Sequence, residues 1–274
     1  MPSPTAKPEH PLASALPPST STSSTAELET PLFFESAGRP LYGVYHAPSR
    51  ERAQAPVLVV CHGLGVEQIA LYRVAVLSAR AAAAEGIPVF RYHARGHGDS
   101  AGDFSAVDFP GLVEDALAAA SEARRLSGRE ATAWLGARFG GLVAARALAQ
   151  DATSRALALW EPAMRPPEYF RGQLRSMLFS QVAQGLKPDA SVDQLVERLE
   201  REGRVDVHGY YLHQRIVDSS RDEDLSKALA TWSGPTFIAQ IENRAKVAPR
   251  TAALIAELES RGARVTSTIE PRLI

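Results

Sequence analysis

The sequence has a single cysteine, Cys61, among its 274 residues, so no disulfide can form within the chain and a reducing, cytoplasmic compartment is expected. It has no apolar run close to the roughly 18 residues of a membrane span. It also lacks an excess of either charge: 30 Lys and Arg stand against 31 Asp and Glu, which argues against nucleic-acid binding. His, Cys, Asp and Glu show no metal-ligand spacing, so we expect neither a metal nor another cofactor.

Apolar residues are plentiful, at 45% of the chain, which is enough for a large hydrophobic core. The exception is Met1–Thr30, which is rich in Pro, Ser and Thr and cannot bury enough surface to offset its ordering entropy. We expect a disordered tail there, although a misplaced start codon would explain the same composition.

Apolar strands and helical patterns alternate through most of the remaining chain. A hairpin is expected over 32–45, and a last strand over 265–269. A continuous apolar run typical of a strand buried on both faces lies at 56–61, and further strands are expected over 87–92, 131–136, 156–160 and 235–241. Helical patterns lie at 67–85, 111–126, 139–150 and 249–261. This alternation predicts the α/β class, with a mostly parallel, doubly wound sheet.

One segment, 166–232, interrupts the alternation and shows no strand pattern. It is predicted to contain amphipathic helices over 169–184, 191–202 and 209–218. We therefore expect a core formed by 31–165 and 233–274, with a helical cap, 166–232, inserted after the sixth strand and lying over the C-terminal edge of the sheet.

Three glycine-containing motifs follow the predicted strands. Gly136-Ala137-Arg138-Phe139-Gly140 joins a strand to a helix, as the nucleophile elbow G-x-S-x-G does, but it has arginine in place of serine. His62-Gly63-Leu64-Gly65 and Arg95-Gly96-His97-Gly98-Asp99-Ser100 follow two earlier strands. Together these motifs resemble the elbow, the oxyanion loop and the R-G-x-G-x-S loop of α/β-hydrolases, which implies that fold.

Within that superfamily, three features resemble the hydrolases of exosortase and exopolysaccharide gene clusters. They are Gly98–Phe104, Leu159-Trp160-Glu161-Pro162, and the arginine at the elbow. This finer resemblance is the basis for one alternative function, a scaffold in exopolysaccharide assembly.

The catalytic triad of the fold is predicted to be missing. A triad needs a nucleophile at the elbow, an acid after a later strand and a histidine after the last strand. The guanidinium of Arg138 cannot attack a carbonyl. The resemblance places Arg244 at the position of the acid, with Glu242 two residues away, and no histidine follows His213. Whether the chain is an enzyme stays open, and impaired catalysis is expected.

The oxyanion groups do not depend on the missing serine, because they are main-chain amides. We predict a ligand site for an anionic or acyl small molecule at the N–H groups of Leu64 and Phe139, with Arg138, Gly63 and His62. Alternatively, Arg138 is only paired with a carboxylate, such as Glu242 or Asp99.

A working hydrolase or acyltransferase on an ester or thioester is the rival hypothesis. Its water would be activated by Glu242 or Asp103, with His208 or His213 from the cap replacing the lost histidine.

The other reactive side chains are expected to be structural. His62 is expected to organise its loop, His93 to make local hydrogen bonds, and His97 to face solvent. Cys61 ends a buried strand and is expected to be an inert core thiol.

Overall fold

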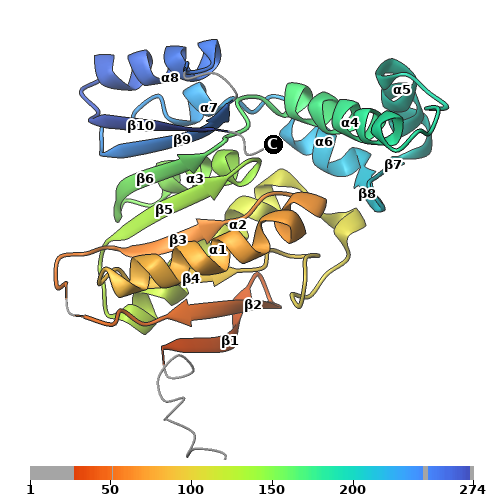
Figure 1. Ribbon diagram of the computed structural model, residues 1–274. Helices are drawn as coiled ribbons and strands as arrows, with labels where there is room; N and C mark the ends of the chain where they lie inside the picture. The colour runs from red at the N-terminus through yellow and green to blue at the C-terminus, as the bar shows by residue number, and fades with distance from the viewer. Residues whose placement is uncertain (1–27, 51, 243–245, 272–274) are drawn as a thin grey trace, which may run out of the picture.

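The computed structural model describes residues 28–50, 52–242 and 246–271, and within them one eight-stranded sheet forms the centre of the molecule (Figure 1). Its spatial order is β1-β2-β4-β3-β5-β6-β9-β10. The first two strands run antiparallel to their neighbours, and the remaining strands are parallel. The strands are β1 Glu29–Ser36, β2 Arg39–His46, β3 Val57–Cys61, β4 Val89–Tyr92, β5 Thr132–Ala137, β6 Ser154–Trp160, β9 Thr236–Glu242 and β10 Val265–Pro271. This arrangement confirms the predicted α/β fold.

The predicted tail falls almost entirely outside the described residues, which begin at Leu28. Strand β1 already begins at Glu29, so the predicted boundary after Thr30 lies two residues too late.

Strand β3 shows why a continuous apolar run was present. Val57, Val59 and Cys61 belong to the main core, which includes residues of α2 and α3, whereas Leu58 and Val60 pack with Ala79 of α1. Helix α1 lies in front of the sheet in Figure 1, and α2 and α3 lie behind it. These helices are α1 Val66–Ala84, α2 Phe109–Ser127 and α3 Gly140–Gln150. Because successive side chains of a strand point to opposite faces, every residue of β3 must be apolar.

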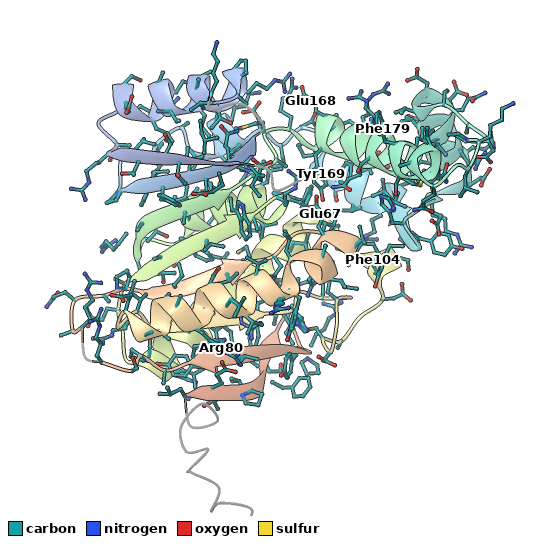
Figure 2. All side chains as sticks on the ribbon, viewed as in Figure 1. Glu67, Arg80, Phe104, Glu168, Tyr169 and Phe179 are labelled. Atoms are coloured by element: carbon teal, nitrogen blue, oxygen red, sulfur yellow. The ribbon has the colours of Figure 1, made fainter. Side chains whose placement is uncertain are left out.

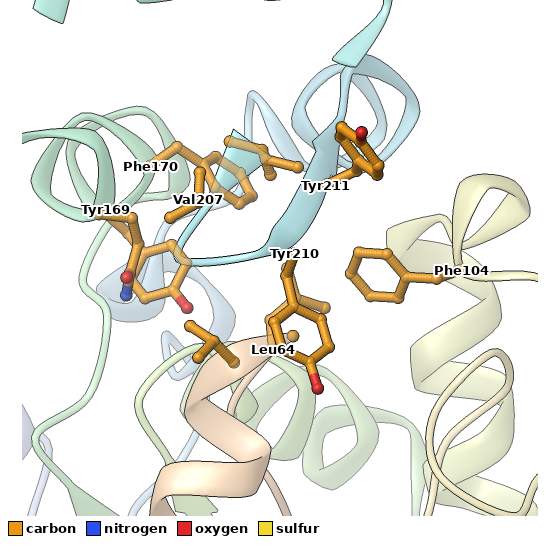
Figure 3. A pocket seen from close by; sticks show the side chains of 11 residues that line it. Leu64, Phe104, Tyr169, Phe170, Val207, Tyr210 and Tyr211 are labelled. Atoms are coloured by element: carbon orange, nitrogen blue, oxygen red, sulfur yellow. The ribbon is translucent and has the colours of Figure 1, made fainter. Parts of the chain in front are cut away.

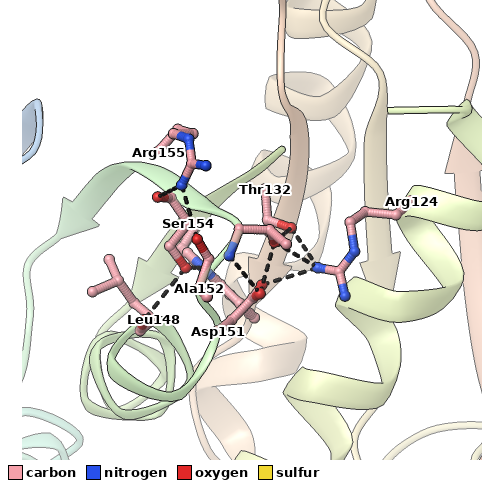
Figure 4. A network of polar contacts seen from close by, with 9 residues as sticks. Arg124, Thr132, Leu148, Asp151, Ala152, Ser154 and Arg155 are labelled. Atoms are coloured by element: carbon pink, nitrogen blue, oxygen red, sulfur yellow. Dashed lines mark hydrogen bonds and ion pairs between the residues drawn. The ribbon is translucent and has the colours of Figure 1, made fainter. Parts of the chain in front are cut away.

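A polar network fixes the end of the sheet away from the cap (Figure 4). Nη1 of Arg124, in α2, donates to Asp151 Oδ2 at 2.9 Å, to Thr132 Oγ1 at 2.7 Å and to Thr153 Oγ1 at 2.9 Å. The network joins the C-terminal part of α2 to the beginnings of β5 and β6. The network therefore fixes the N-terminal ends of β5 and β6, opposite their carboxyl ends.

The segment predicted as the cap lies beside the carboxyl ends of the parallel strands (Figure 1). It contains α4 Pro166–Ala183, α5 Val192–Glu202, β7 Arg204–Val207, β8 Tyr210–His213, α6 Gln214–Ser220 and α7 Leu225–Ala228. The chain then returns to the sheet through β9, α8 Pro249–Ser260 and β10. Among the helices of the described residues, none is both long and apolar enough to cross a bilayer.

The prediction of a helix over 209–218 was wrong for its first half. Strands β7 and β8 form an antiparallel hairpin, and the helix begins only at Gln214. The two turn residues, His208 and Gly209, have φ of 55° and 83°. Positive φ at both positions is what a tight two-residue hairpin turn requires.

Candidate functional site

The elbow has the sharp backbone turn that the glycine motif predicted. Strand β5 ends at Ala137, Arg138 has φ of 55°, and α3 begins at Gly140. A positive φ is unfavourable for a residue with a side chain, so surrounding bonds must hold it. The Arg138 N–H donates to the Trp160 carbonyl at 2.9 Å, and its own carbonyl accepts from Gly141 at 3.1 Å and from Ala163 at 3.0 Å.

The guanidinium of Arg138 is held between two carboxylates. Its Nε donates to Glu67 Oε1 at 2.9 Å, and its Nη1 lies 3.4 Å from Glu161 Oε2. Neither partner was among those expected: Asp99 lies instead 3.7 Å from His93 Nδ1, and the side chain of Glu242 is outside the described residues.

Glu67 also binds the cap. Its Oε2 accepts a hydrogen bond of 2.7 Å from the Tyr169 hydroxyl, and its Oε1 accepts from Gln173 Nε2, both donors lying in α4. Figure 2 shows Glu67 and Tyr169 where the cap meets the core. We call Glu67, Arg138, Glu161, Tyr169 and Gln173 the Glu67 cluster.

The electrostatics of the cluster keep both of its donors protonated. Burial by itself lowers the pKa of Arg138, but the charge of Glu67 and its hydrogen bond outweigh burial, so the pKa lies above its ordinary value. Burial and the neighbouring Glu67 carboxylate raise the pKa of Tyr169 well above its ordinary value. Tyr169 is therefore a neutral donor and Arg138 a permanent cation.

Glu161 is the second partner of Arg138, and its place in the Leu159-Trp160-Glu161-Pro162 motif did not by itself indicate that contact. It follows β6 directly and has φ of 45°, while its Oε1 accepts from the Ile241 N–H at 2.6 Å. Strands β5 and β6 are parallel neighbours, so the residues after them converge. That adjacency, together with the carboxylate after the strand, was the available signal.

The predicted ligand residues do not share one cavity. Arg138 lines a cavity of about 350 Å³ together with Arg165 and Arg250. The other four, His62, Gly63, Leu64 and Phe139, line a separate cavity of about 20 Å³.

The two amides predicted to form an oxyanion site are available. Among the described residues, the N–H groups of Leu64 and Phe139 make no hydrogen bond. Phe139 immediately precedes the first residue of α3, so the positive end of that helix adds to the field at its amide.

Two of the histidine predictions can be compared directly with the structure. His97 was expected to face solvent, and that was wrong: it is buried, its Nδ1 lies 2.9 Å from the Arg95 carbonyl and its Nε2 accepts from the Gly65 N–H at 3.4 Å. His97 therefore joins the R-G-x-G-x-S loop to the oxyanion loop. His93 makes the expected local bonds, since its carbonyl accepts from the Ser100 hydroxyl at 2.6 Å.

His62 and Cys61 lie beneath the elbow, and burial makes His62 a weak base and Cys61 a weak nucleophile. The Nε2 atom of His62 is buried without a partner among the described residues, and burial lowers the pKa of His62 to about 3. Burial raises the pKa of the Cys61 thiol to about 12. A thiol nucleophile must ionise, so Cys61 is inert at neutral pH.

Three residues of the rival hydrolase hypothesis, Asp103, His208 and His213, do not line the cavity of Arg138. Asp103 and His213 line a groove beside α1, and His208 is exposed at the hairpin turn. Glu242 is the last residue of β9, and Arg244 lies outside the described residues. No group of three or more His, Cys, Asp or Glu side chains in the described part of the chain could hold a metal ion.

Stability is expected to fall as the pH is lowered below neutral. His46 is buried in β2, accepts from Arg91 Nε at 2.9 Å, and has a pKa lowered by burial and by Arg91 to about 4, against 6.5 in the unfolded chain. Between these values only the unfolded chain takes up the proton, so the stabilisation is complete above about pH 6.5 and is lost as the pH falls. The free energy of unfolding should drop by about 2 kcal/mol between pH 7 and pH 5 through His46 alone.

Urea denaturation at the two pH values measures this effect. His46→Gln should remove the His46 share of the drop and leave the share of His62, which has the same sign and is of similar size because burial lowers the pKa of His62 to about 3. An equally steep drop in His46→Gln would contradict the assignment.

The sheet order, the elbow, the oxyanion loop and the cap define an α/β-hydrolase fold. The chain belongs to the serine aminopeptidase S33 family, whose model matches residues 52–248. A comparison with curated proteins gives no match.

Solved structures share the fold at low sequence identity. The ferulic-acid complex of Est1E from Butyrivibrio proteoclasticus is 17% identical, covers 88% of this chain and 89% of its own, and has a TM-score of 0.63. The Pyrococcus furiosus esterase Pf2001 is 13% identical, with coverages of 93% and 88% and a TM-score of 0.63. The α/β-hydrolase GrgF from Penicillium sp. sh18 is 17% identical, with coverages of 89% and 89% and a TM-score of 0.59.

Proposed function

We propose that this chain is a non-catalytic member of its family that binds a small acyl ligand between the cap and the elbow. The observation that carries the proposal is the ion pair of Arg138 with Glu67 at 2.9 Å. The position from which a serine would attack is taken by a guanidinium that has no nucleophilic lone pair and is fixed by a carboxylate.

Neither Cys61 nor Tyr169 supplies the missing nucleophile. The Cys61 thiol is buried and its pKa is about 12. Tyr169 is protonated and already donates to Glu67. General-base activation of water remains chemically possible, but it contributes only about 10²–10⁴-fold, and Asp103 and His213 line a different cavity from Arg138.

The charges at the elbow favour an acyl carbonyl over a free anion. Two carboxylates, Glu67 and Glu161, face the one guanidinium of Arg138, so an added anion would have to compete with both. The amides of Leu64 and Phe139 line the other cavity and can donate to a neutral carbonyl oxygen without removing an ion pair. We therefore propose that the acyl oxygen accepts hydrogen bonds from these two amides, and that Arg138 positions the elbow.

The similar structures support a ligand of this kind. Est1E is a fold relative whose structure contains ferulic acid, and Pf2001 is an esterase. A carboxylic acid bound to one protein and the description of the other as an esterase support an acyl ligand on this scaffold.

Two measurements test the proposal. Purified protein should not hydrolyse p-nitrophenyl butyrate above the protein-free rate, and a fluorophosphonate should not label it. Ethyl butyrate should remain intact and should shift the backbone N–H resonances of Leu64 and Phe139 in a ¹⁵N-labelled sample.

Phosphate serves as the matched anionic probe in the same spectrum. It should leave the Arg138 Nε–H resonance in place, whereas an anion site at Arg138 would shift it. Hydrolysis of the ester by the wild type and its loss in Arg138→Ala would overturn the non-catalytic assignment.

A further inference from the structure

A third cavity is larger than the two at the elbow, and no elbow residue lines it. Its volume is about 940 Å³, and neither Arg138 nor Phe139 lines it. Its walls come from α1, the loop around Phe104 and the β7–β8 hairpin of the cap. A volume of this size matches cavities that hold small organic ligands.

Aromatic rings form much of the wall. Tyr72, Phe104, Tyr210 and Tyr211 all line the cavity, and we call it the tyrosine groove. Tyr210 and Tyr211 remain 40% and 47% exposed, although burial of such side chains is favourable. A ligand ring bound in the groove would bury the exposed surface of both tyrosine side chains.

The charge of the groove is positive. Arg73 and Arg204 line it, and neither makes an ion pair with any residue of the described ranges. The carboxylate of Asp103 is the acidic side chain in the wall. The guanidinium carbon of Arg204 lies 4.5 Å from the centre of the Tyr211 ring, so this cation is already held against an aromatic face.

The histidines of the wall do not change this balance at neutral pH. Burial lowers the pKa of His93, His97 and His213 below the ordinary value for histidine. All three rings are neutral near pH 7, and the positive charge therefore comes from the two arginines.

The groove continues inward into an apolar slot of about 40 Å³. Figure 3 shows this slot, where Tyr210 lies between Leu64 and Phe104 and the cap contributes Phe170 and Val207. Gly65, Phe104, Tyr210 and Tyr211 line both spaces. Leu64 in turn lines both the slot and the small cavity at the Phe139 amide, so the slot lies between the groove and the oxyanion amides.

We propose that the tyrosine groove binds aromatic carboxylates, with the ring against Tyr210 and Tyr211 and the carboxylate at Arg204. This inference goes beyond the proposed function, because neither Arg138 nor Phe139 lines the groove and its ligand is an anion rather than a neutral acyl group. Arg73 adds to the attraction without being the primary partner.

Cinnamate is the probe, compared with cinnamamide, which is neutral and similarly shaped, and with hexanoate, which has no ring. Titration calorimetry on the full chain should give cinnamate the highest affinity, about tenfold above cinnamamide at low salt. The difference should shrink as the ionic strength rises.

Variants separate the two contributions. Arg204→Gln should weaken cinnamate about fivefold to tenfold and leave cinnamamide unchanged, since only the charge is lost. Tyr210→Ala should weaken both probes about tenfold. Arg264→Gln, which removes an exposed arginine outside the groove, and Phe179→Ala, which removes an exposed aromatic from the cap, should change neither affinity.

The proposal is overturned if wild-type protein binds cinnamamide as tightly as cinnamate, or if Arg264→Gln weakens cinnamate as much as Arg204→Gln does. It is also overturned if cinnamate fails to bind while ethyl butyrate still shifts the Leu64 and Phe139 amides, a result that leaves the proposed function intact. Hydrolysis of p-nitrophenyl butyrate would instead refute the non-catalytic assignment, and the charge preference measured with Arg204→Gln would still stand.

Discussion

Replacing Glu67 with alanine is expected to lower the free energy of unfolding by about 3 kcal/mol, as for other partly buried ion pairs that lose one partner. The carboxylate accepts from Arg138, Tyr169 and Gln173, and it is only 13% exposed. Without it, the Arg138 guanidinium keeps, among the described residues, two hydrogen bonds of 3.4 Å to Glu161, one to its carboxylate and one to its carbonyl oxygen, and the Tyr169 hydroxyl is left without its acceptor. Urea denaturation followed by circular dichroism measures the change.

A carboxylate elsewhere on the same cap–core boundary is the control. Glu168 is 44% exposed and pairs with the exposed Arg250, so Glu168→Ala should change stability by less than about 0.5 kcal/mol. Glu67→Gln should fall between the two, because the amide oxygen can still accept from Tyr169 but the charge is gone. Equal stabilities of Glu67→Ala and Glu168→Ala would mean that the cluster does not hold the cap to the core.

A double-mutant cycle separates the ion pair from the cap contacts. If Arg138 is fixed chiefly by Glu67, Arg138→Ala should cost much less in the Glu67→Ala background than in the wild type. Additive effects would leave Glu161 as the main partner of Arg138.

The strands and the elbow could be predicted because local signals agreed with the fold. Val57–Cys61 is apolar throughout because its two faces pack in different clusters, and Gly136 and Gly140 mark a turn where strand meets helix. The position of Arg138 followed from that turn alone. Such signals depend on neighbours in the chain and need no knowledge of distant contacts.

The sequence contains a signal for the β7–β8 hairpin, but the signal is weak because the strands are short. Val205 and Val207 are buried and alternate with exposed Arg204 and Asp206, but a four-residue strand gives only two periods. His208-Gly209 is the turn signal, since both residues take positive φ. The helical periodicity after Gln214 extended the expected helix backward over β8.

The partners of Arg138 could not be derived from spacing. Glu67 is 71 positions away and lies at the start of a helix, where an acidic residue is common without any distant partner. The burial of His97 likewise depends on Gly65 of the oxyanion loop, which meets His97 only in the folded chain, and on the Phe104 ring. Division of the predicted ligand residues between two cavities depends on side-chain packing, and sequence patterns do not describe it.

Replacing Gly140 with alanine is expected to cost more than about 4 kcal/mol, the upper range for single substitutions. A Cβ atom there would lie 2.3 Å from the carbonyl oxygens of both Cys61 and His62. Both atoms belong to the backbone at the end of β3, so neither can turn aside as a flexible side chain would. We expect little folded protein, and residual folded protein should melt far below the wild type.

Gly172→Ala is the matched control, because Gly172 lies in helix α4 and has no atom within 4 Å of its Cβ position. Alanine should stabilise that helix by up to about 1 kcal/mol. The contrast would show that Gly140 of G-x-R-x-G is required by the contact between α3 and the end of β3, whatever residue stands at position 138. The glycine motif is then evidence for the fold, and only the residue at position 138 is evidence about catalysis. If the Gly140→Ala protein had the melting temperature of the wild type, Gly140 would not be sterically required. The glycine motif could then not be interpreted as a feature of the fold that is independent of residue 138.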